Sequence, residues 1–470
     1  MSQYGELGVR IGERKIMDGY RGIADILVET GREVHSFEEL KEWIESRKKR
    51  QKVSISRIEL EDCTPWYYDE DEGIIRNPAR SFFQITGIRC CYPGGITIEQ
   101  PIVLQSEIGF LGIICKRING IWHFLMQAKI EPGNINYVQI SPTVQATKSN
   151  FTRLHGGREP EYLHWFFRMN PENVLVDQIQ SEQSSRFLGK RNRNVILKTE
   201  EDIEETEAFR WMTLYQLKQF MAIDNCVNMD TRTVLSCIPY VFLDEPTEGY
   251  TKEFTDSIST IDRKAIRDLY IHANDYKMFK AGKSSFIPLT ELREWEMRKD
   301  ELVHRGRYPF KVIYCGLEIE GREVTKWNQP LIEALGDAVF GLVCSKSSGI
   351  LEILVRLKPE IGCYDVVEVG PTVQEEYGSK EIRDKTASLF FTRLKQKKNI
   401  LIDVVLSEEG GRFYHEQNRN VVMMVDKEEV QYDSSLYTWA TVGTLNAMTQ
   451  INNCLNIQLR NLLTLLYMYN

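Results

Sequence analysis

The 470-residue sequence has no long apolar run, since none approaches the ~20 residues that a membrane-spanning helix needs. Its first residues, MSQYGELGVRIGERK, lack the apolar core of a secretory signal peptide. The net charge of −8 argues against a nucleic-acid-binding protein. An apolar content of 42% and a charged content of 27% are typical of globular proteins in water. We therefore expect a cytoplasmic protein with neither nucleic acid nor membrane as a partner.

Several standard cofactor and nucleophile motifs are also missing. The ten cysteines form no CxxC pair and show no Cys/His spacing of a zinc site, so we expect reduced, mostly buried cysteines and no metal. The sequence has no P-loop and no GxGxxG linked to a predicted strand, which argues against bound ATP or NAD. It also has no GxSxG nucleophile elbow. No cofactor is expected.

The sequence contains an internal repeat. Pro-Thr-Val-Gln occurs at 142–145 and again at 371–374, an offset of 374 − 145 = 229, and residues 100–145 align with 329–374 without a gap. Matches continue at 181–195 with 407–421, and at 224–232 with 452–460. Upstream, 37–43 resembles 289–295 at an offset of 252, which gives the first copy 252 − 229 = 23 extra residues. Two copies of this length predict two fused domains rather than a solenoid.

Each copy is predicted to be a mixed α+β domain with a hairpin-rich sheet. Residues 110–129 read as two strands around an Asn-Gly turn, and 340–358 keep a glycine at the corresponding place. The pattern further predicts strands at 192–198 and 418–425 and an amphipathic helix at 37–50. It also predicts segments that turn from strand to helix at 206–223 and 435–451. We place the first domain at 1–240, with an N-terminal helical extension, and the second at 241–470, after a polar linker.

The segment 127–162 has the densest functional chemistry in the chain. It places lysine, arginine and histidine beside amides and hydroxyls, a combination that suits a diphosphate with a polar base or sugar. The alternative is a charged surface loop. Recurrence of Thr143 and Gln145 as Thr372 and Gln374 favours a binding site. The candidate binding residues are Lys129, Thr143, Gln145, Asn150, Arg153, His155, Thr372 and Gln374.

A second cluster, SEEGGRFYHEQNRN at 407–420, supplies acids and bases. Glu409, Tyr414 and His415 are the acid/base candidates, and Asn418 is a further binding candidate. If 412–415 form a strand, Tyr414 and His415 face opposite ways, and a structural histidine is the alternative. The first copy has Gln183 in place of Glu409, so the two copies differ chemically.

Trp66 lies in a third segment of interest, CTPWYYDEDEGIIRNPARSFF, within the apparent excess of the first copy. Its ring and the two tyrosines that follow could stack on a sugar or a base. The same aromatic residues could equally form the edge of a core.

The residues LMQAKIEPGNINYVQISPTVQATKSNFTRLHGG (125–157) and SEEGGRFYHEQNRNV (407–421) closely resemble the nucleotide-diphospho-hexose 2,3-dehydratases, and the resemblance covers nearly the whole chain. It implies a homodimer of subunits that each contain two duplicated, Nudix-like domains. It also implies a dTDP-4-keto-6-deoxyhexose substrate, which loses its carbon-2 hydroxyl to give a 3,4-diketo-2,6-dideoxy sugar. Two nucleotide-sugar pockets per subunit are implied, one of them catalytic. The Nudix metal helix (REUxEExGU) is absent, which argues against metal-dependent hydrolysis.

The implied reaction needs a base, an acid, an enolate donor and a diphosphate clamp. Glu409, Tyr414 and His415 would be the acid and base, and the cationic and amide residues of 127–162 would be the clamp. These groups lie in different copies, so either one pocket draws on both copies or one group is misassigned. A surviving Nudix-type nucleotide-sugar hydrolase and a non-catalytic nucleotide-sugar binding protein are the alternative functions.

Overall fold

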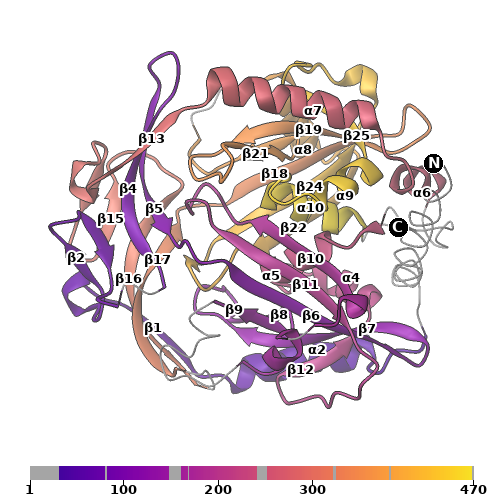
Figure 1. Ribbon diagram of the computed structural model, residues 1–470, viewed down its shortest axis with the longest axis horizontal. Helices are drawn as coiled ribbons and strands as arrows, with labels where there is room; N and C mark the ends of the chain where they lie inside the picture. The colour runs from indigo at the N-terminus through magenta and orange to yellow at the C-terminus, as the bar shows by residue number, and fades with distance from the viewer. Residues whose placement is uncertain are drawn as a thin grey trace, which may run out of the picture.

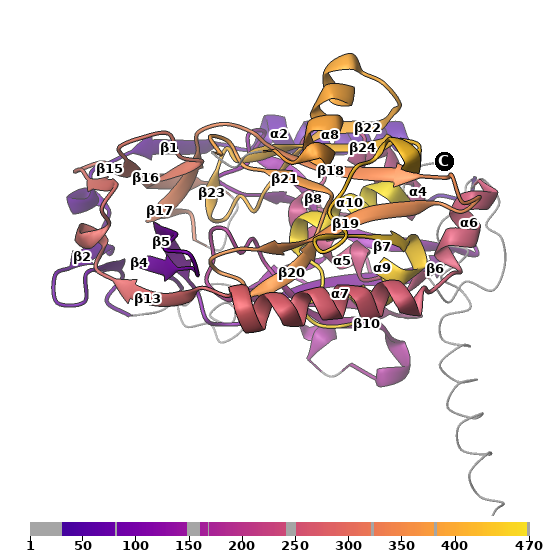
Figure 2. The same cartoon turned by 90° about the horizontal axis from the view of Figure 1, so that it is seen from above.

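The computed structural model describes residues 31–79, 82–147, 160–167, 169–240, 251–320, 324–379 and 383–467. The chain forms two similar halves that lie side by side, and each half has its own seven-stranded sheet (Figure 1). Two smaller sheets lie together at one end of the molecule, beside the two seven-stranded sheets, at the left of both views (Figures 1 and 2).

The seven-stranded sheet of the first half is built around the expected hairpin. β6 (Gly109–Ile118) and β7 (Ile121–Ile130) pair antiparallel. Asn119 and Gly120 have φ of 54° and 85°, so the turn residues adopt the left-handed region that Asn-Gly favours. The strand order is β10-β11-β6-β7-β12, with β11 parallel to β6, β8 on β7 and β9 on β6. The other strands are β8 (Val138–Ser141), β9 (Val144–Ala146), β10 (Val174–Ser181), β11 (Arg191–Lys198) and β12 (Phe209–Met212).

The second half repeats this sheet strand for strand. Its order is β20-β19-β18-β24-β22, with β24 parallel to β18, β21 on β18 and β25 on β19. The predicted α+β fold with a tandem repeat is therefore confirmed. The strands are β18 (Ala338–Ser345), β19 (Glu352–Pro359), β20 (Val367–Gly370), β21 (Val373–Glu375), β22 (Ile400–Ser407), β24 (Gln417–Met424) and β25 (Tyr437–Thr441).

The two smaller sheets exchange strands between the halves. β1 (Val53–Arg57) comes from the first half but pairs with β16 of the second, and β13 (Lys283–Ile287) comes from the second half but pairs with β4 of the first. These backbone hydrogen bonds cross between the halves and tie them together. The remaining strands are β2 (Tyr67–Asp69), β3 (Ile74–Arg76), β4 (Gln84–Cys91), β5 (Thr97–Leu104), β14 (Trp295–Met297), β15 (Glu301–His304), β16 (Phe310–Ile319), β17 (Lys326–Ala334) and β23 (Phe413–Tyr414).

The upstream alignment of 37–43 with 289–295 is wrong. Residues 37–43 begin the helix α2 (Phe37–Arg50), whereas 289–295 form the short 3-10 turn η7 (Leu289–Glu291) and the start of β14. The counterpart of η7 is η2 (Leu60–Asp62), at the same offset of 229, and the counterpart of α2 is α7 (Arg263–Asp275). The first copy therefore has no 23-residue excess. The spacing of Glu, Leu and Trp is typical of a helix in both segments. At 289–295, however, β14 pairs with β15, so this segment forms a turn and the start of a strand.

The helices cover the sheets outside and join them inside. α7 and α2 lie on opposite sides of the molecule, and α5 and α10 lie in the middle (Figure 1). A single hydrophobic cluster includes side chains of both halves, so the halves share a core. The other helices are α4 (Leu214–Met221), α5 (Met229–Ser236), α6 (Lys252–Ile258), α8 (Lys385–Gln396), α9 (Val442–Thr449), α10 (Ile457–Tyr467), η3 (Leu163–Phe166), η4 (Pro171–Asn173), η6 (Tyr276–Lys280) and η8 (Lys427–Glu429).

The repeated Pro-Thr-Val-Gln lies where two hairpin strands separate. β6 and β7 pair near their turn but then diverge, and β9 and β8 pair with them further along. Thr143 fills the fork, because its Oγ1 accepts from Ile114 N at 3.0 Å and donates to Leu125 O at 2.5 Å. Thr372 accepts from Val343 N at 2.9 Å and donates to Leu354 O in the same way. The shared threonine thus satisfies two buried backbone groups of the sheet.

Replacing Thr143 by valine should destabilise the fold by roughly 2–4 kcal/mol, because two buried backbone groups each lose a partner. Urea unfolding followed by circular dichroism measures the change. Thr143→Ser is the matched control, since it keeps the hydroxyl and should lose much less. Equal stability of the valine and serine variants would contradict the assigned role.

Candidate active site

The site begins with two loops that the halves exchange. The first-half loop (182–190) joins β10 to β11, and the second-half loop (408–416) joins β22 to β24. Gly133, just after β7 of the first half, donates to Gly410 O at 2.8 Å and accepts from His415 N at 2.7 Å. Gly362 of the second half donates to Ser184 O at 2.9 Å and accepts from Gly189 N at 2.8 Å. Each half therefore supplies a loop that covers the end of the other half's hairpin.

Glycine is required at both docking points. A Cβ at Gly133 would lie 1.6 Å from Phe413 O, and one at Gly362 would lie 1.9 Å from Phe187 O. No side chain fits at these distances, so the backbones approach as closely as they do only because glycine has no Cβ. Phe187 and Phe413 also meet edge to face at 5.5 Å, which packs the two loops against each other.

The second-half loop carries Glu409 to the first half's hairpin. A Cβ built on Gly411 would lie 3.0 Å from Glu409 Oε1 and 3.8 Å from Glu131 Oε1, so the two carboxyl groups lie close together. Gln145 Nε2 donates to Glu131 Oε1 at 2.9 Å, and Asn228 Nδ2 donates to Gln145 Oε1 at 3.2 Å. We call this group the Glu131 cluster; it consists of Lys129, Glu131, Gln145, Asn228, Asp230 and Glu409.

Burial and neighbouring carboxyl groups shift the pKa values of two acids of this cluster, Glu409 and Asp230. Burial raises the pKa of Glu409, and Arg412 acts in the opposite direction. Burial also raises the pKa of Asp230 well above its usual range, and the neighbouring Glu182 and Glu409 add to the rise. Glu182 itself has its pKa raised to about 8 by burial and by Glu409. Buried acids with raised pKa values beside cations are typical of proton-transfer sites.

The second half contains an equivalent group with different chemistry. Gln374 Nε2 donates to Glu360 Oε1 at 2.9 Å, and Asn456 Nδ2 donates to Gln374 Oε1 at 2.8 Å, as in the first half. Gln183 and Gln458, however, stand where the first half's hairpin has Glu409 and Asp230. We call this group the Glu360 cluster; it consists of Gln183, Lys358, Glu360, Gln374, Asn456 and Gln458.

Amides cannot exchange protons as carboxyl groups do at neutral pH. At the two positions that differ, the Glu131 cluster has carboxyl groups and the Glu360 cluster has amides. Burial raises the pKa of Glu360 to about 7, and Glu416, which accepts from Gln183 at 3.0 Å, and Glu376 are further acids beside that cluster. Within the described residues, no three His, Cys, Asp or Glu side chains are placed to hold a metal ion. The Glu131 cluster is therefore the better equipped of the two for acid–base chemistry.

The structure brings together some predicted site residues from different halves. Lys129, Gln145 and Glu409 meet in the Glu131 cluster, where Lys129 Nζ donates to Gln145 O at 3.1 Å. Lys129 and Gln145 of the first group thus lie in one cluster with Glu409 of the second group. Gln374 lies in the Glu360 cluster. Asn150, Arg153 and His155 lie outside the described residues.

Other predicted residues are used by the fold itself. Thr143 and Thr372 hold the forks of the two hairpins. Asn418 Nδ2 donates to Glu408 Oε1 at 2.7 Å, and its Oδ1 accepts from Ala338 N at 3.0 Å, so it links β24 to β18. Trp66 is buried and packs on Phe83 at 4.6 Å within the core between the smaller sheets. The core-edge interpretation of Trp66 fits this position better than a ligand wall does.

Tyr414 and His415 do not face opposite ways. Their rings stack at 4.0 Å with an interplanar angle of 16°, because β23 ends at Tyr414 and His415 has a φ of 54°. The charged groups that act on both rings are Arg57 and Glu333, which do not belong to the Glu131 cluster. Burial lowers the pKa of His415 and raises that of Tyr414. The Arg57 guanidinium lies 5.9 Å from the centre of the Tyr414 ring, whereas the backbone of His415 remains part of the docking contact at Gly133.

Sequence reasoning missed Asp230, Asn228 and Glu131. The signal for Asp230 was present, because DNCVNMDTR aligns with NNCLNIQLR and places Asp230 opposite Gln458. An acid in one copy opposite an amide in the other is the same change that Glu409 and Gln183 show. Both changes place an acid in the Glu131 cluster and an amide in the Glu360 cluster.

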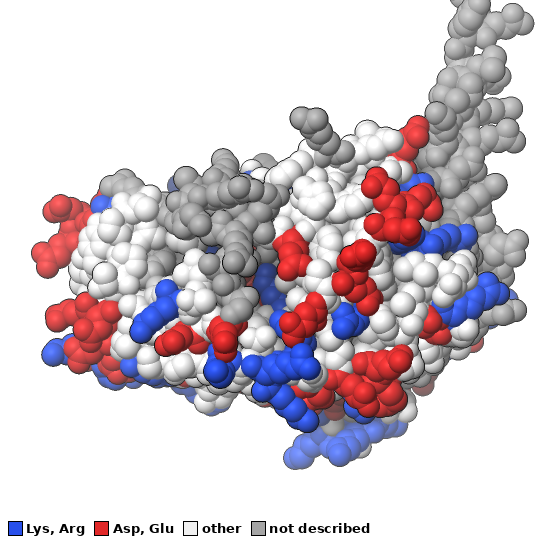
Figure 3. Space-filling model, turned by 90° about the horizontal axis from the view of Figure 1, so that it is seen from below, with Lys and Arg blue, Asp and Glu red and all other residues white. Residues whose placement is uncertain are grey.

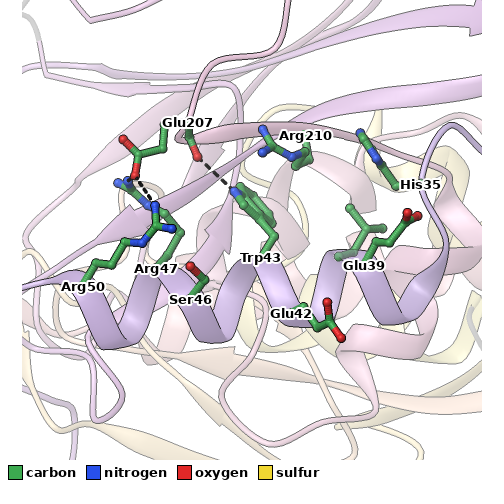
Figure 4. Close-up of a pocket in the computed structure, with 10 residues that line it drawn as sticks. His35, Glu39, Glu42, Trp43, Ser46, Arg47, Arg50, Glu207 and Arg210 are labelled. Carbon is green, nitrogen blue, oxygen red and sulfur yellow. Dashed lines mark hydrogen bonds and ion pairs between the residues drawn. The ribbon is translucent and has the colours of Figure 1, made fainter.

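A surface pocket of about 440 Å³ lies elsewhere, between α2 and the residues before and within β12. Figure 4 shows Arg47 and Arg50 directed toward Glu207, and Trp43 Nε1 donates to Glu207 O at 3.0 Å. Arg47 and Arg50 are thus paired within the pocket, and His35 and Arg210 are paired with Glu205. Acidic and basic side chains are also interspersed over the face in Figure 3. No described helix is long and apolar enough to cross a membrane.

Comparison with known proteins agrees with the duplicated architecture. The family model for NDP-hexose 2,3-dehydratase matches twice, over residues 37–238 and 267–466. A dTDP-4-dehydro-6-deoxy-alpha-D-glucopyranose 2,3-dehydratase of Streptomyces violaceoruber is 38% identical, over 90% of this chain and 95% of its own. Proteins of the same name from Saccharopolyspora spinosa and Amycolatopsis orientalis are 35% and 33% identical, over 90% and 91% of this chain and 90% and 89% of their own. The chain belongs to the NDP-hexose 2,3-dehydratase family.

Proposed function

We propose that the protein is a dTDP-4-keto-6-deoxy-D-glucose 2,3-dehydratase and that the Glu131 cluster is its active site. The three relatives are named for this reaction and match about nine-tenths of the chain. The observation that carries the assignment of the site is the acid-to-amide difference between the two clusters. Only the Glu131 cluster combines carboxyl groups from both halves with a lysine.

The reaction needs no redox cofactor, because elimination of water transfers no net electrons. The 4-keto group of the substrate acidifies the hydrogen on carbon 3. In the proposed mechanism Glu409 removes this proton, and Lys129 stabilises the negative charge that develops on the carbon-4 oxygen. The carbon-2 C–O bond then breaks as its oxygen is protonated, and water leaves. The resulting enol tautomerises to the 3,4-diketo-2,6-dideoxy sugar.

Glu409 suits the role of the base. Its side chain is partly exposed, and the charged groups that act on it are Arg412, Glu131, Lys190 and Lys129. These cations favour the carboxylate, while burial makes that carboxylate more basic than an exposed glutamate. The Nudix-like origin of each half, a homodimer and a cytoplasmic location belong to the same proposal and are supported by the family resemblance.

The purified protein should convert dTDP-4-keto-6-deoxyglucose to a product lighter by one water, without added metal or nicotinamide. Mass spectrometry of the sugar nucleotide measures this, with and without EDTA. Release of dTMP that depends on Mg²⁺ would instead indicate a Nudix-type hydrolase. Binding of dTDP without turnover would indicate a non-catalytic binding protein, and either result would overturn the proposal.

Glu409→Gln should lower kcat by roughly 100-fold or more, because it removes the general base. The change gives the site the amide that the other half already has at Gln183, so the fold should tolerate it. Affinity for dTDP, measured by calorimetry, should stay within a few-fold. Full activity of this variant would exclude Glu409 as the base.

Turnover should fall as the pH drops through the pKa of Glu409, since only the carboxylate accepts a proton. Burial raises this pKa above the ordinary value of 4.5, so the loss should occur at a higher pH than for an exposed glutamate. The pH dependence of kcat/KM measures it. An acidic limb that stays unchanged in Glu409→Asp would count against this assignment.

A further inference from the structure

Asp230 is a buried acid of the Glu131 cluster that has no role in the proton abstraction assigned to Glu409. It lies in the first turn of α5, is only 2% exposed, and its Oδ1 has no hydrogen-bond partner among the described residues. A buried carboxyl oxygen without a partner costs stability. Such a group calls for an explanation other than folding, and a ligand that supplies the missing partner is one.

The start of α5 is held inside the Glu131 cluster. Asn228 caps the helix, because its Oδ1 accepts from Thr231 N at 2.9 Å. Its Nδ2 donates both to Gln145 Oε1 at 3.2 Å and to Ser141 Oγ at 2.8 Å. The cap therefore fixes Asp230, two residues later, relative to Gln145 on β9 and Ser141 on β8.

The surroundings of Asp230 favour its protonated form. The charged groups that act most on it are three acids, Glu182, Glu409 and Glu131, and one cation, Lys129. The helix N-terminus favours the anion. Burial and the three acids act in the opposite direction, and the pKa of Asp230 is raised well above its usual range. On Glu409, in contrast, three cations act, Arg412, Lys190 and Lys129, beside the acid Glu131.

The second half contains a natural comparison. Gln458 occupies the same place at the start of α10, after the cap Asn456, whose Oδ1 accepts from Leu459 N at 2.9 Å. The amide atoms of Gln458 likewise have no partner among the described residues. In both halves this position thus presents a buried polar atom without a hydrogen-bond partner among the described residues. Only in the first half, whose hairpin also contacts the Glu409 loop, is this side chain a carboxylic acid that can transfer a proton.

We propose that Asp230 is the acid that protonates the carbon-2 hydroxyl as it leaves. This assignment rests on the proposed dehydratase reaction and completes it. Glu409 takes the proton from carbon 3, and the electron pair of that C–H bond forms the enolate whose oxygen faces Lys129. The enolate then collapses to the carbon 2–carbon 3 double bond as the carbon-2 C–O bond breaks. The proton of Asp230 goes to the departing oxygen, so water leaves and Asp230 becomes a carboxylate. Two carboxyl groups in opposite environments thus divide the acid and base roles.

The test separates the two proton transfers in D₂O. Asp230→Asn should slow water loss by roughly 100-fold or more. Recovered substrate should still gain deuterium at carbon 3, beyond the exchange seen without enzyme, because Glu409 is intact. Glu409→Gln should lose both water loss and exchange. Nuclear magnetic resonance measures the exchange, and mass spectrometry measures the loss of water.

Two further variants keep the test decisive. Asp230→Gln, which introduces the residue of the other half, should match the asparagine variant, and neither should melt at a lower temperature than the wild type. Asp230→Glu should recover much of the activity and move the alkaline limb of the pH–rate profile, since rate falls as the acid loses its proton. Should the amide variants fail to fold, the shift in Asp230→Glu decides the matter.

Three outcomes would overturn the assignment. One is wild-type-like turnover in Asp230→Asn. Another is the joint loss of turnover and carbon-3 exchange in a folded Asp230→Asn, and the third is an alkaline limb that Asp230→Glu leaves in place. Failure of the wild-type protein to release water from the substrate would instead refute the proposed function itself.

Discussion

The proposed active site depends on the close approach of two backbones at Gly133. There the loop of the second half docks on the hairpin of the first, and it brings Glu409 beside Glu131. The pair at Gly362 and Ser184 repeats the contact with the halves interchanged. Because the site is shared, neither half contains a complete set of acids. The exchanged strands β1 and β13 and the common core hold the halves in the register that this contact needs.

Two buried arginines reinforce the same exchange. Arg232 on α5 donates to Ser407 O at 2.8 Å, and Arg460 on α10 donates to Ser181 O at 2.5 Å. Each bond runs from the helix of one half to the strand end of the other, where an exchanged loop begins. Duplication thus produced a symmetric frame, within which Asp230 and Glu409 became the chemical difference. The frame tolerates acid or amide at these places, as Gln458 and Gln183 show.

Much of the fold could be predicted from local pattern and from the repeat. The Asn-Gly hairpin, the strands at 192–198 and 418–425, and the strand-to-helix segments follow from alternation and turn chemistry. The exchange of β1 and β13 could not be predicted, because a strand's sequence does not say which sheet edge it joins. The alignment of 37–43 with 289–295 failed for the same reason: similar local patterns met different tertiary partners.

The site was predicted in part. The sequence identified Glu409, Gln145 and Lys129 as candidates from their chemistry and from the repeat. It could not show that they lie together, because the second-half loop brings Glu409 to the first half. Thr143 and Asn418 recur because the sheet needs them, so repetition alone did not distinguish a binding residue from a structural one. Departure from the repeat, at Asp230 and Glu409, is the signal on which the proposed site rests.

The central claim is that one site, assembled from both halves around Glu131, carries out the chemistry. A crystal structure of the Glu409→Gln variant with its dTDP-4-keto-6-deoxyglucose substrate tests it most directly. The account predicts that carbon 3 lies beside residue 409 and that the carbon-2 hydroxyl lies within hydrogen-bonding distance of Asp230. A reacting sugar bound beside Tyr414 and His415, or only at the Glu360 cluster, would contradict it.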